Sequence, residues 1–231
     1  MLDHPNIVKY VESYEDERYM YIVMEYIKNA TELTDVIIKQ KKLLSKDQRK
    51  NNDSLFPEDE IRRLMYMIFG GLHHIHSNRV IHRDLKPENV IIDSDFRIKI
   101  IDFGLSKMAS KAELGGFILG TPEYLAPEVY EKKGRSDAYT SCLDCWAAGV
   151  IMFFLICGRL PFAGNNDAEL EEEIRHEDAM RGTNFGRWSN ISDDAKDLIK
   201  KLLEKSPAFR ITAEESLQHE FFKPIREQKL N

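Results

Sequence analysis

The stretch Ile81-His-Arg-Asp-Leu-Lys-Pro-Glu-Asn-Val-Ile-Ile-Asp93 decides how the rest of the sequence is interpreted. It is a run of polar and charged side chains, with one proline, that ends in the apolar triplet Val90–Ile92. This triplet and a second apolar segment, residues 98–101, flank Ser94 and Asp95 and are predicted to be short strands that pair. Because the polar run joins a predicted helix to a strand, its side chains can be held rigidly at a cleft.

Composition limits the class of protein. The chain has 231 residues, of which 42% are hydrophobic and 31% charged, and this fits one large globular domain or one domain and part of another. The formal net charge of −6 gives no overall basic field, so we expect neither nucleic acid nor a membrane as a partner, and the oligomeric state stays open. Three cysteines without a disulfide-scaffold pattern, and an N-terminus unlike a signal peptide, lead us to expect a cytoplasmic protein.

Apolar periodicity predicts a mainly helical chain. Two early strands, residues 7–14 and 19–24, are joined by a polar turn. The apolar run from Cys145 to Cys157 is shorter than the roughly 20 residues that cross a bilayer, so we expect a buried helix there. The polar stretch 39–54 is expected to be an exposed insertion. Helices are predicted over residues 32–39, from Pro57 through Ile75, and over 142–157, 167–175, 193–203 and 213–217.

Four side chains near the two short strands are predicted to converge on one point: Asp84, Lys86, Asn89 and Asp102. Asn89 and Asp102 offer the hard oxygen ligands that magnesium prefers, and magnesium commonly comes with substrate phosphates. Asp84 can orient and deprotonate a hydroxyl, and Lys86 can balance charge on a phosphoryl group. Phosphoryl transfer needs little else, because it depends mainly on positioning and charge. The alternative is a surface loop with solvated charges.

Three motifs, in this order and at this spacing, resemble the eukaryotic protein kinase family: His82-Arg-Asp-Leu-Lys-Pro-Glu-Asn89, Asp102-Phe-Gly104 and Ala126-Pro-Glu128. The resemblance implies an α+β, protein kinase-like fold, with a mainly helical large lobe and a two-stranded remnant of the small lobe. The implied domains are residues 1–24 for the remnant of the small lobe, 25–222 for the large lobe and 223–231 for a C-terminal tail.

The same resemblance implies a kinase that uses ATP and Mg²⁺ and phosphorylates protein serine or threonine hydroxyls. Asp84 would be the catalytic base, and Asn89 and Asp102 would be the magnesium ligands. Thr121, in a Gly-Thr-Pro-Glu-Tyr segment, would bond to Asp84 and Lys86. That segment and Lys86 point to serine/threonine rather than tyrosine specificity.

A hinge beginning at Met24, the implied gatekeeper, would bind adenine through its backbone. By itself this stretch could equally be a strand that runs into a loop. The residues implied for the nucleotide are Met24, Glu25, Tyr26, Ile27, Glu88, Asn89, Ile91 and Asp102.

Other matched positions would have structural roles. Glu128 would pair with Arg210 in the core, Asp144 would brace the catalytic loop from the buried helix, and Arg83 would organise the activation segment. Residues 191–203 and His219-Glu-Phe-Phe222 are most like the calcium/calmodulin-dependent kinase group, although the sequence contains no complete EF-hand loop.

The sequence also departs from the family pattern. It contains no G-x-G-x-x-G and no V-A-I-K-like strand before the early strands, and His4-Pro-Asn-Ile-Val8 resembles the segment that follows these elements in the family. We therefore expect an incomplete catalytic domain, in which the two early strands have unpaired edges and an uncovered apolar face. The alternative is a catalytically inactive kinase-like binding or regulatory module.

Two expectations concern regulation and substrates. Residues 115–119, where the family often carries a phosphorylated hydroxyl, contain none, so we expect activity without phosphorylation of the activation segment. Glu32 and Glu88 match acidic positions that would contact basic residues upstream of the target hydroxyl; they could equally be solvated carboxylates. The remaining hydroxyls before Tyr124 are Ser106, Ser110 and Thr121, and Glu113 is the acid that could serve Arg83.

Overall fold

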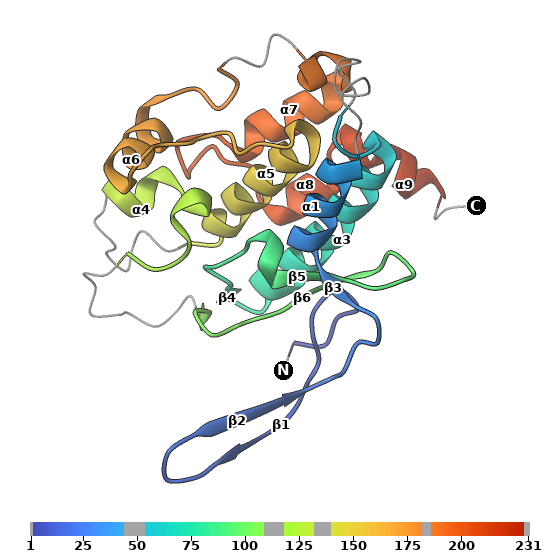
Figure 1. The fold of residues 1–231 in the computed structure, drawn as a ribbon, viewed down its shortest axis with the longest axis vertical. Coiled ribbons are helices and arrows are strands. Elements are labelled where there is room, and N and C mark those ends of the chain that lie inside the picture. The colour runs from blue at the N-terminus through green and yellow to red at the C-terminus, as the bar shows by residue number, and fades with distance from the viewer. Residues whose placement is uncertain (1, 44–53, 109–117, 132–139, 182–185, 229–231) are drawn as a thin grey trace.

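The computed structural model describes residues 2–43, 54–108, 118–131, 140–181 and 186–228, and its elements are arranged as in Figure 1. The strands are β1 Tyr10–Glu15, β2 Met20–Met24, β3 Thr31–Glu32, β4 Val80–Ile81, β5 Val90–Ile92, β6 Ile98–Ile100 and β7 Lys107–Met108. The α-helices are α1 Leu33–Leu43, α3 Glu58–Ser77, α4 Pro127–Glu131, α5 Cys142–Cys157, α6 Asp167–His176, α7 Asp193–Leu202, α8 Ala213–Gln218 and α9 Lys223–Gln228. Short 3-10 helices are η1 Pro87–Asn89, η2 Pro122–Tyr124, η4 Gly186–Asn190 and η5 Glu220–Phe222.

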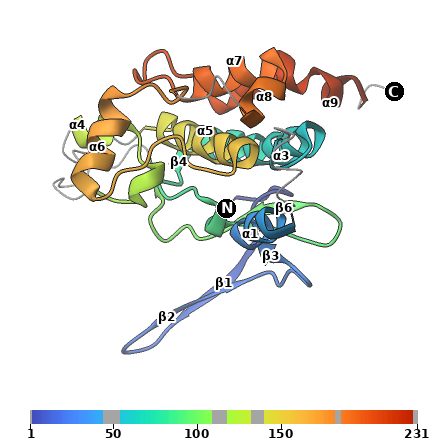
Figure 2. The ribbon, with the colours of Figure 1, turned by 45° about the horizontal axis from the view of Figure 1, so that its top comes forward.

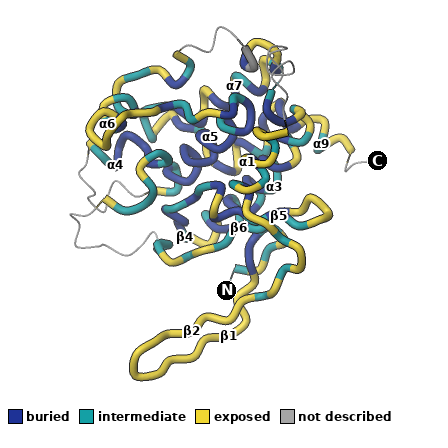
Figure 3. Tube along the Cα trace, in the orientation of Figure 1, coloured by how far each residue is buried: buried dark blue, intermediate teal, exposed yellow. Residues whose placement is uncertain are grey.

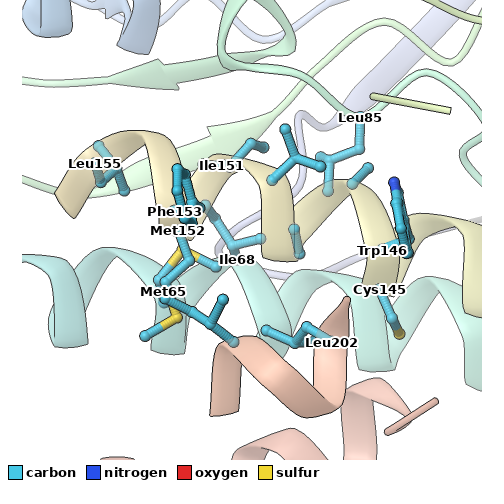
Figure 4. Packing of buried hydrophobic residues seen from close by; sticks show 14 of the residues in the cluster. Met65, Ile68, Leu85, Cys145, Trp146, Ile151, Met152, Phe153, Leu155 and Leu202 are labelled. Atoms are coloured by element: carbon cyan, nitrogen blue, oxygen red, sulfur yellow. The ribbon is translucent and has the colours of Figure 1, made fainter. Parts of the chain in front are cut away.

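Helix α5 forms the centre of the helical lobe, and the prediction that it is buried is confirmed. Residues on every side of it are buried, because α3 packs on one side and α7 on another. A Cβ on Gly149 would lie only 2.8 Å from the Cβ of Leu202, so glycine permits the close approach of α5 and α7. Figure 4 shows the apolar side chains that fill this core, among them Met65, Ile68, Trp146, Ile151, Phe153 and Leu202.

Helix α3 connects this core to the small sheets. Its predicted apolar stripe, Ile61 through Ile75, is buried at every expected position, which confirms the helical periodicity. Negative charge in its first turn, at Glu58, Asp59 and Glu60, suits the N-terminal end of a helix. In Figure 2, α7, α8 and α9 form an outer layer, α3 and α5 lie beneath them, and α1 and the short strands lie on the far side.

The short strands lie where the polar stretch meets the helical lobe. Strands β5 and β6 form the predicted antiparallel pair, and β3 adds to the other edge of β5. The strand expected from residue 7 begins instead at Tyr10. Ile7 forms a parallel bridge with Ile100 of β6, and the Val8 N–H donates to the Ile100 carbonyl at 3.0 Å, so this segment is bound to the large lobe before the hairpin starts.

The β1–β2 hairpin extends away from the rest of the molecule. All of its strand residues are exposed, including Met20 at 68% and Ile22 at 58% (Figure 3). The expectation of an uncovered apolar face is therefore confirmed. Helix α1 extends to Leu43, beyond the expected end at residue 39; the rest of the expected insertion, residues 44–53, lies outside the described residues.

Two features bear on the environment of the chain. Among the described residues, no helix combines the length and apolarity that a bilayer crossing requires. Cys142, Cys145 and Cys157 form no disulfide, and burial raises the pKa of the Cys145 thiol above its ordinary value.

A buried ion pair joins α4 to the segment before α8. Arg210 donates two hydrogen bonds to the Glu128 carboxylate, at 2.6 and 2.8 Å, and the two side chains are 0% and 3% exposed. Arg210 also donates to the carbonyls of Cys142 and Glu204, so the guanidinium is satisfied on several sides. The pairing expected from the sequence is confirmed.

We expect Glu128→Ala to lower the free energy of unfolding by about 3–5 kcal/mol, because it leaves the Arg210 charge buried without its partner. Urea unfolding at pH 7 measures this loss. The matched control is Glu220→Ala, whose carboxylate is 65% exposed in its pair with Lys223 and should change stability by less than about 0.5 kcal/mol. Equal losses in the two variants would show that the buried pair adds nothing special.

Candidate functional site

The polar loop after β4 is hydrogen-bonded to one buried carboxylate. Asp144, in the first turn of α5, is 1% exposed and accepts hydrogen bonds from the backbone N–H groups of His82 and Arg83, both at 2.9 Å. His76 donates to the same carboxylate through Nε2 at 2.8 Å. Burial alone would raise the pKa of Asp144, but the hydrogen bond and charge of His76 and the interactions with His82 outweigh burial and lower it.

His82 links this loop to the Asp-Phe-Gly segment. Its Nε2 lies 3.0 Å from the Ile101 carbonyl, which can only accept, so Nε2 carries the proton. Its Nδ1 then accepts the Asp84 N–H at 3.4 Å. The His82 ring also meets the Phe103 ring edge to face, with centroids 5.0 Å apart. The neutral imidazole therefore fixes the spacing between Asp84 and the segment that carries Asp102.

Asp84, Lys86, Asn89 and Thr121 form a connected polar cluster. Thr121 Oγ1 donates to Asp84 Oδ1 at 2.8 Å and accepts from Lys86 Nζ at 2.8 Å, and the Thr121 N–H donates to the same Asp84 oxygen at 3.1 Å. Lys86 Nζ lies 3.1 Å from Asp84 Oδ2. A negative and a positive group are thus held side by side, and both side chains are partly exposed to solvent.

Asn89 faces in two directions. Its Nδ2 donates to the Asp84 carbonyl at 2.8 Å and to Asp84 Oδ2 at 3.2 Å. Because those partners can only accept, the amide oxygen must point away from Asp84. The Ile101 N–H donates to the Asn89 carbonyl at 2.9 Å, which brings the next residue, Asp102, beside Asn89. An amide oxygen and an exposed carboxylate are chemically suited to a hard divalent cation.

Two residues of the site have left-handed backbone conformations that are uncommon outside glycine. Arg83 has φ 71° and Asp102 has φ 59°. The surrounding bonds explain how these conformations persist: Asp144 accepts the Arg83 N–H, and Asp102 Oδ1 accepts the Gly104 N–H at 3.0 Å. Such outliers often occur at functional sites, where the neighbouring structure compensates the strain.

The described part of the activation segment packs against this loop. The Arg83 side chain donates to the Leu105 carbonyl through Nε, and the Ser106 hydroxyl donates to the Phe103 carbonyl at 2.7 Å. Of the other residues considered in the sequence, Ser110 and Glu113 lie outside the described residues.

Six of the eight residues expected to bind the nucleotide line two cavities, and Glu88 and Asn89 line neither. Glu25, Tyr26, Ile27 and Ile91 line a cavity of about 560 Å³, together with Lys99. A mainly apolar cavity of about 600 Å³ lies between the β1–β2 hairpin and the Asp-Phe-Gly segment, and its lining includes Met24, Asp102, Phe103 and Gly104. The structure therefore does not bring all the residues of the expected set to one cavity wall.

Glu32 and Glu88 are both exposed, in β3 and η1, and these two elements contact each other. Glu88 also acts on Tyr124: burial, and then the charges of Glu88 and Glu123, raise the pKa of the Tyr124 phenol. The surface beside the catalytic loop is thus acidic. Glu88 is exposed toward solvent rather than part of either cavity wall.

Comparison with known proteins identifies the family. The family model described as "Protein kinase domain" matches residues 1–222. The chain is 36% identical over 232 residues to "Calcium-dependent protein kinase 5" of Plasmodium falciparum (isolate 3D7), covering 99% of this chain and 37% of the relative. It is 32% identical over 228 residues to "Probable serine/threonine-protein kinase fhkE" of Dictyostelium discoideum, covering 96% of this chain and 30% of the relative.

The chain therefore belongs to the protein kinase domain family. The helices and short antiparallel strands described above agree with the kinase-like α+β fold expected from the three motifs. The chain spans about a third of the length of these two relatives.

Sequence reasoning missed two groups at the site. His76 belongs to a cluster of histidines that we interpreted only as the end of a helix, yet it donates to Asp144. Lys99 was part of a predicted strand, yet its ammonium reaches Glu25 at 2.7 Å. For Lys99 a signal was present, because a lysine between two isoleucines in a short strand must face away from the core.

We expect Asp144→Asn to lower the free energy of unfolding by about 1–3 kcal/mol at pH 7, because the amide cannot accept all three buried hydrogen bonds. The pKa of Asp144 is lowered on folding, so the carboxylate stabilises the fold above its ordinary pKa of 3.8, and this contribution is lost as the pH falls through the lower folded value. Urea unfolding at pH 7 and pH 3 should therefore show a smaller difference between wild type and variant at pH 3.

The control for this experiment is Asp193→Asn, since the Asp193 side chain is 99% exposed. Its stability should stay within about 0.5 kcal/mol of wild type at both pH values. An Asp144→Asn variant as stable as this control at pH 7 would contradict the role of Asp144.

Proposed function

We propose that this chain is the catalytic part of a serine/threonine protein kinase, which transfers the terminal phosphate of ATP to protein hydroxyls. The observation that carries the proposal is the cluster in which Thr121 and Lys86 contact the Asp84 carboxylate while Asn89 orients its amide oxygen away from it. Asp84 would accept the proton of the substrate hydroxyl, and Lys86 would stabilise charge that develops on the transferred group. Thr121 would hold both in place.

Asn89 and Asp102 would hold Mg²⁺, which when bound neutralises charge on the phosphates and orients them. The donor chemistry supports this assignment. The Asn89 amide oxygen points away from Asp84, and the Asp102 carboxylate takes no part in the hydrogen bonds that orient Asp84. Met24 to Ile27 and Ile91 would contact the adenine, and Glu88 and Asn89 would lie near the phosphates. The division into residues 1–24, 25–222 and 223–231 remains part of this proposal.

The second candidate is a catalytically inactive kinase-like binding or regulatory module. It is favoured by the division of the residues expected for the nucleotide between two separate cavities, because a nucleotide seated in either cavity would contact only some of them. The two candidates differ in whether this chain binds magnesium and ATP and transfers phosphate.

Two further assignments complete the proposal. We propose a cytoplasmic location, supported by Cys142, Cys145 and Cys157, which form no disulfide and so suit a reducing compartment. We also propose that activity does not require phosphorylation of the activation segment, since residues 115–119 carry no hydroxyl.

The test compares wild type with Asp84→Asn and Asp102→Asn, using calorimetry for Mg-ATP binding and radiolabelled ATP with a generic basic serine peptide for transfer. Asp84→Asn should keep Mg-ATP binding but lower transfer about 10²–10⁴-fold, because the amide cannot accept the proton. Asp102→Asn should lose the magnesium dependence of binding.

The control is Asp95→Asn, a 65% exposed carboxylate in the turn between β5 and β6, which should behave as wild type. A wild-type chain that neither binds Mg-ATP nor transfers phosphate would favour the inactive module instead.

We also propose substrates with basic residues upstream of the serine or threonine, with Glu32 and Glu88 as their contacts. Glu32→Gln should lower kcat/KM for a peptide with upstream arginine about tenfold, because one charge pair is lost, and should leave an otherwise identical alanine peptide unchanged. Glu214→Gln, at an exposed position of α8, is the control. If the two peptides are affected equally, Glu32 does not contact the basic residue.

A further inference from the structure

The base of the β1–β2 hairpin is joined to the large lobe by a partly buried ion pair. Lys99 Nζ lies 2.7 Å from Glu25 Oε1, and the two side chains are only 22% and 30% exposed. Glu25 is the first residue after β2, and Lys99 is the middle residue of β6. The pair therefore spans the boundary between the hairpin and the helical lobe, whereas most ion pairs among the described residues lie within a single helix or turn.

Three chain segments meet at this pair. Glu25 Oε1 also accepts the Lys9 N–H at 2.7 Å, and the Glu25 N–H donates to the Lys9 carbonyl at 2.9 Å. Lys99 Nζ donates in addition to the Ile7 carbonyl at 3.2 Å. One ammonium group and one carboxylate thus connect three segments: the residues just before β1, the residue just after β2 and the centre of β6.

Strand alternation explains why Lys99 is in this position. Its neighbours Ile98 and Ile100 are buried toward the core, so Lys99 faces the opposite side of the sheet. Its partner across the antiparallel β5–β6 pair is Ile91. Lys99 and Ile91 lie on the same face and line the same 560 Å³ cavity as Glu25, Tyr26 and Ile27.

The hairpin has few other means of holding its orientation. Its strand residues are all exposed, and β1 and β2 make their extensive contacts with each other. The interactions at residues 6–9 and 25 must therefore carry much of its connection to the large lobe. A charge-assisted bond of 2.7 Å between partly desolvated groups is stronger than a fully exposed ion pair.

We propose that Lys99 is a positioning residue for the nucleotide: through Glu25 it fixes the backbone of residues 25–27 against the face of the sheet that carries Ile91. This inference rests on the proposed function, since it assigns the base of ATP to that backbone. Lys99 does not touch the reacting phosphate. Its effect falls on how well the base is held and not on the transfer step.

The ionisation of Glu25 is consistent with this role. Burial alone would raise the pKa of Glu25, but the hydrogen bonds from Lys99 and the Lys9 N–H outweigh burial and lower it. The other charged groups near this pair are the ammonium of Lys9, from the segment before β1, and Lys28, Asp93 and Arg97 around the cavity. His4 also interacts electrostatically with Lys99. The carboxylate thus stays ionised at neutral pH and keeps Lys99 bound.

The test uses the whole chain with three variants: Lys99→Met, which keeps the length of the stem, Lys99→Arg, which keeps the charge, and Lys196→Met as control. Lys196 is a matched lysine, since its side chain is 25% exposed in an ion pair with Asp193 on α7. The first measurement is amide hydrogen exchange at Lys9 and Glu25. The second is the Kd of Mg-ATP and of magnesium tripolyphosphate, which lacks the base.

Lys99→Met should speed exchange of the Lys9 and Glu25 amides about three- to tenfold and should weaken Mg-ATP binding by a similar factor, because the junction opens more often. Binding of tripolyphosphate should not change. Lys99→Arg should return both quantities to within about twofold of wild type, and Lys196→Met should alter neither.

Several results would overturn the inference. Exchange that stays within about twofold of wild type in Lys99→Met would show that the ion pair does not hold the junction. Faster exchange with unchanged Mg-ATP affinity, or an equal loss for tripolyphosphate, would show that Lys99 does not position the base. A wild-type chain that binds no ATP would overturn the proposed function and the nucleotide role with it, while the exchange result would still decide whether Lys99 holds the hairpin.

Discussion

The buried carboxylate of Asp144 is the constraint on which the site depends. A charge that is almost fully enclosed is tolerated only when its oxygens are hydrogen-bonded, and here the donors are the backbone of the catalytic loop and one imidazole. The loop therefore cannot move relative to α5 without leaving that charge unsatisfied. Because α5 is enclosed by α3 and α7, Asp144 couples the loop to the packed core, and the buried side chain of Leu85 adds a second connection.

This arrangement explains why so many polar groups can lie beside an apolar core. Arg83 and Asp102 hold backbone conformations that each cost about 1–3 kcal/mol for a residue other than glycine. Both are compensated by hydrogen bonds to groups that are themselves fixed, at Asp144 and at Gly104. The core thus shapes the loop, while the side chains of Asp84 and Lys86 remain partly exposed to solvent.

The sequence predicted the large elements well because their patterns are long. The stripe on α3 and the continuous apolar run of α5 extend over several turns, so helical periodicity is unambiguous there. Strands β3, β4 and β7 contain only two residues each, too few for any period to be seen. They exist because a partner strand is nearby, and Ile7 pairs with Ile100 for the same reason, which no local pattern reveals.

At the site, too, some groups could be predicted from the sequence and others could not. Motif order identified Asp84, Asn89 and Asp102 as a group, and the physical case for their chemistry follows from the types of their side chains. Contacts between distant segments were inaccessible: His76 reaches Asp144 across 68 positions of sequence, and Lys99 reaches Glu25. Six of the residues chosen for the nucleotide are divided between two cavities, an arrangement that no local sequence pattern reveals.

The separation between an enclosed helical lobe and an exposed hairpin also divides the chromophores of the chain. Both tryptophans, Trp146 and Trp188, are buried in the helical lobe, whereas residues 10–26 carry five tyrosines and no tryptophan. Indole fluorescence therefore reports on the packing around α5, while five of the nine tyrosines lie in residues 10–26. Melting of the lobe can thus be followed by indole fluorescence without a contribution from the hairpin and without attaching a label.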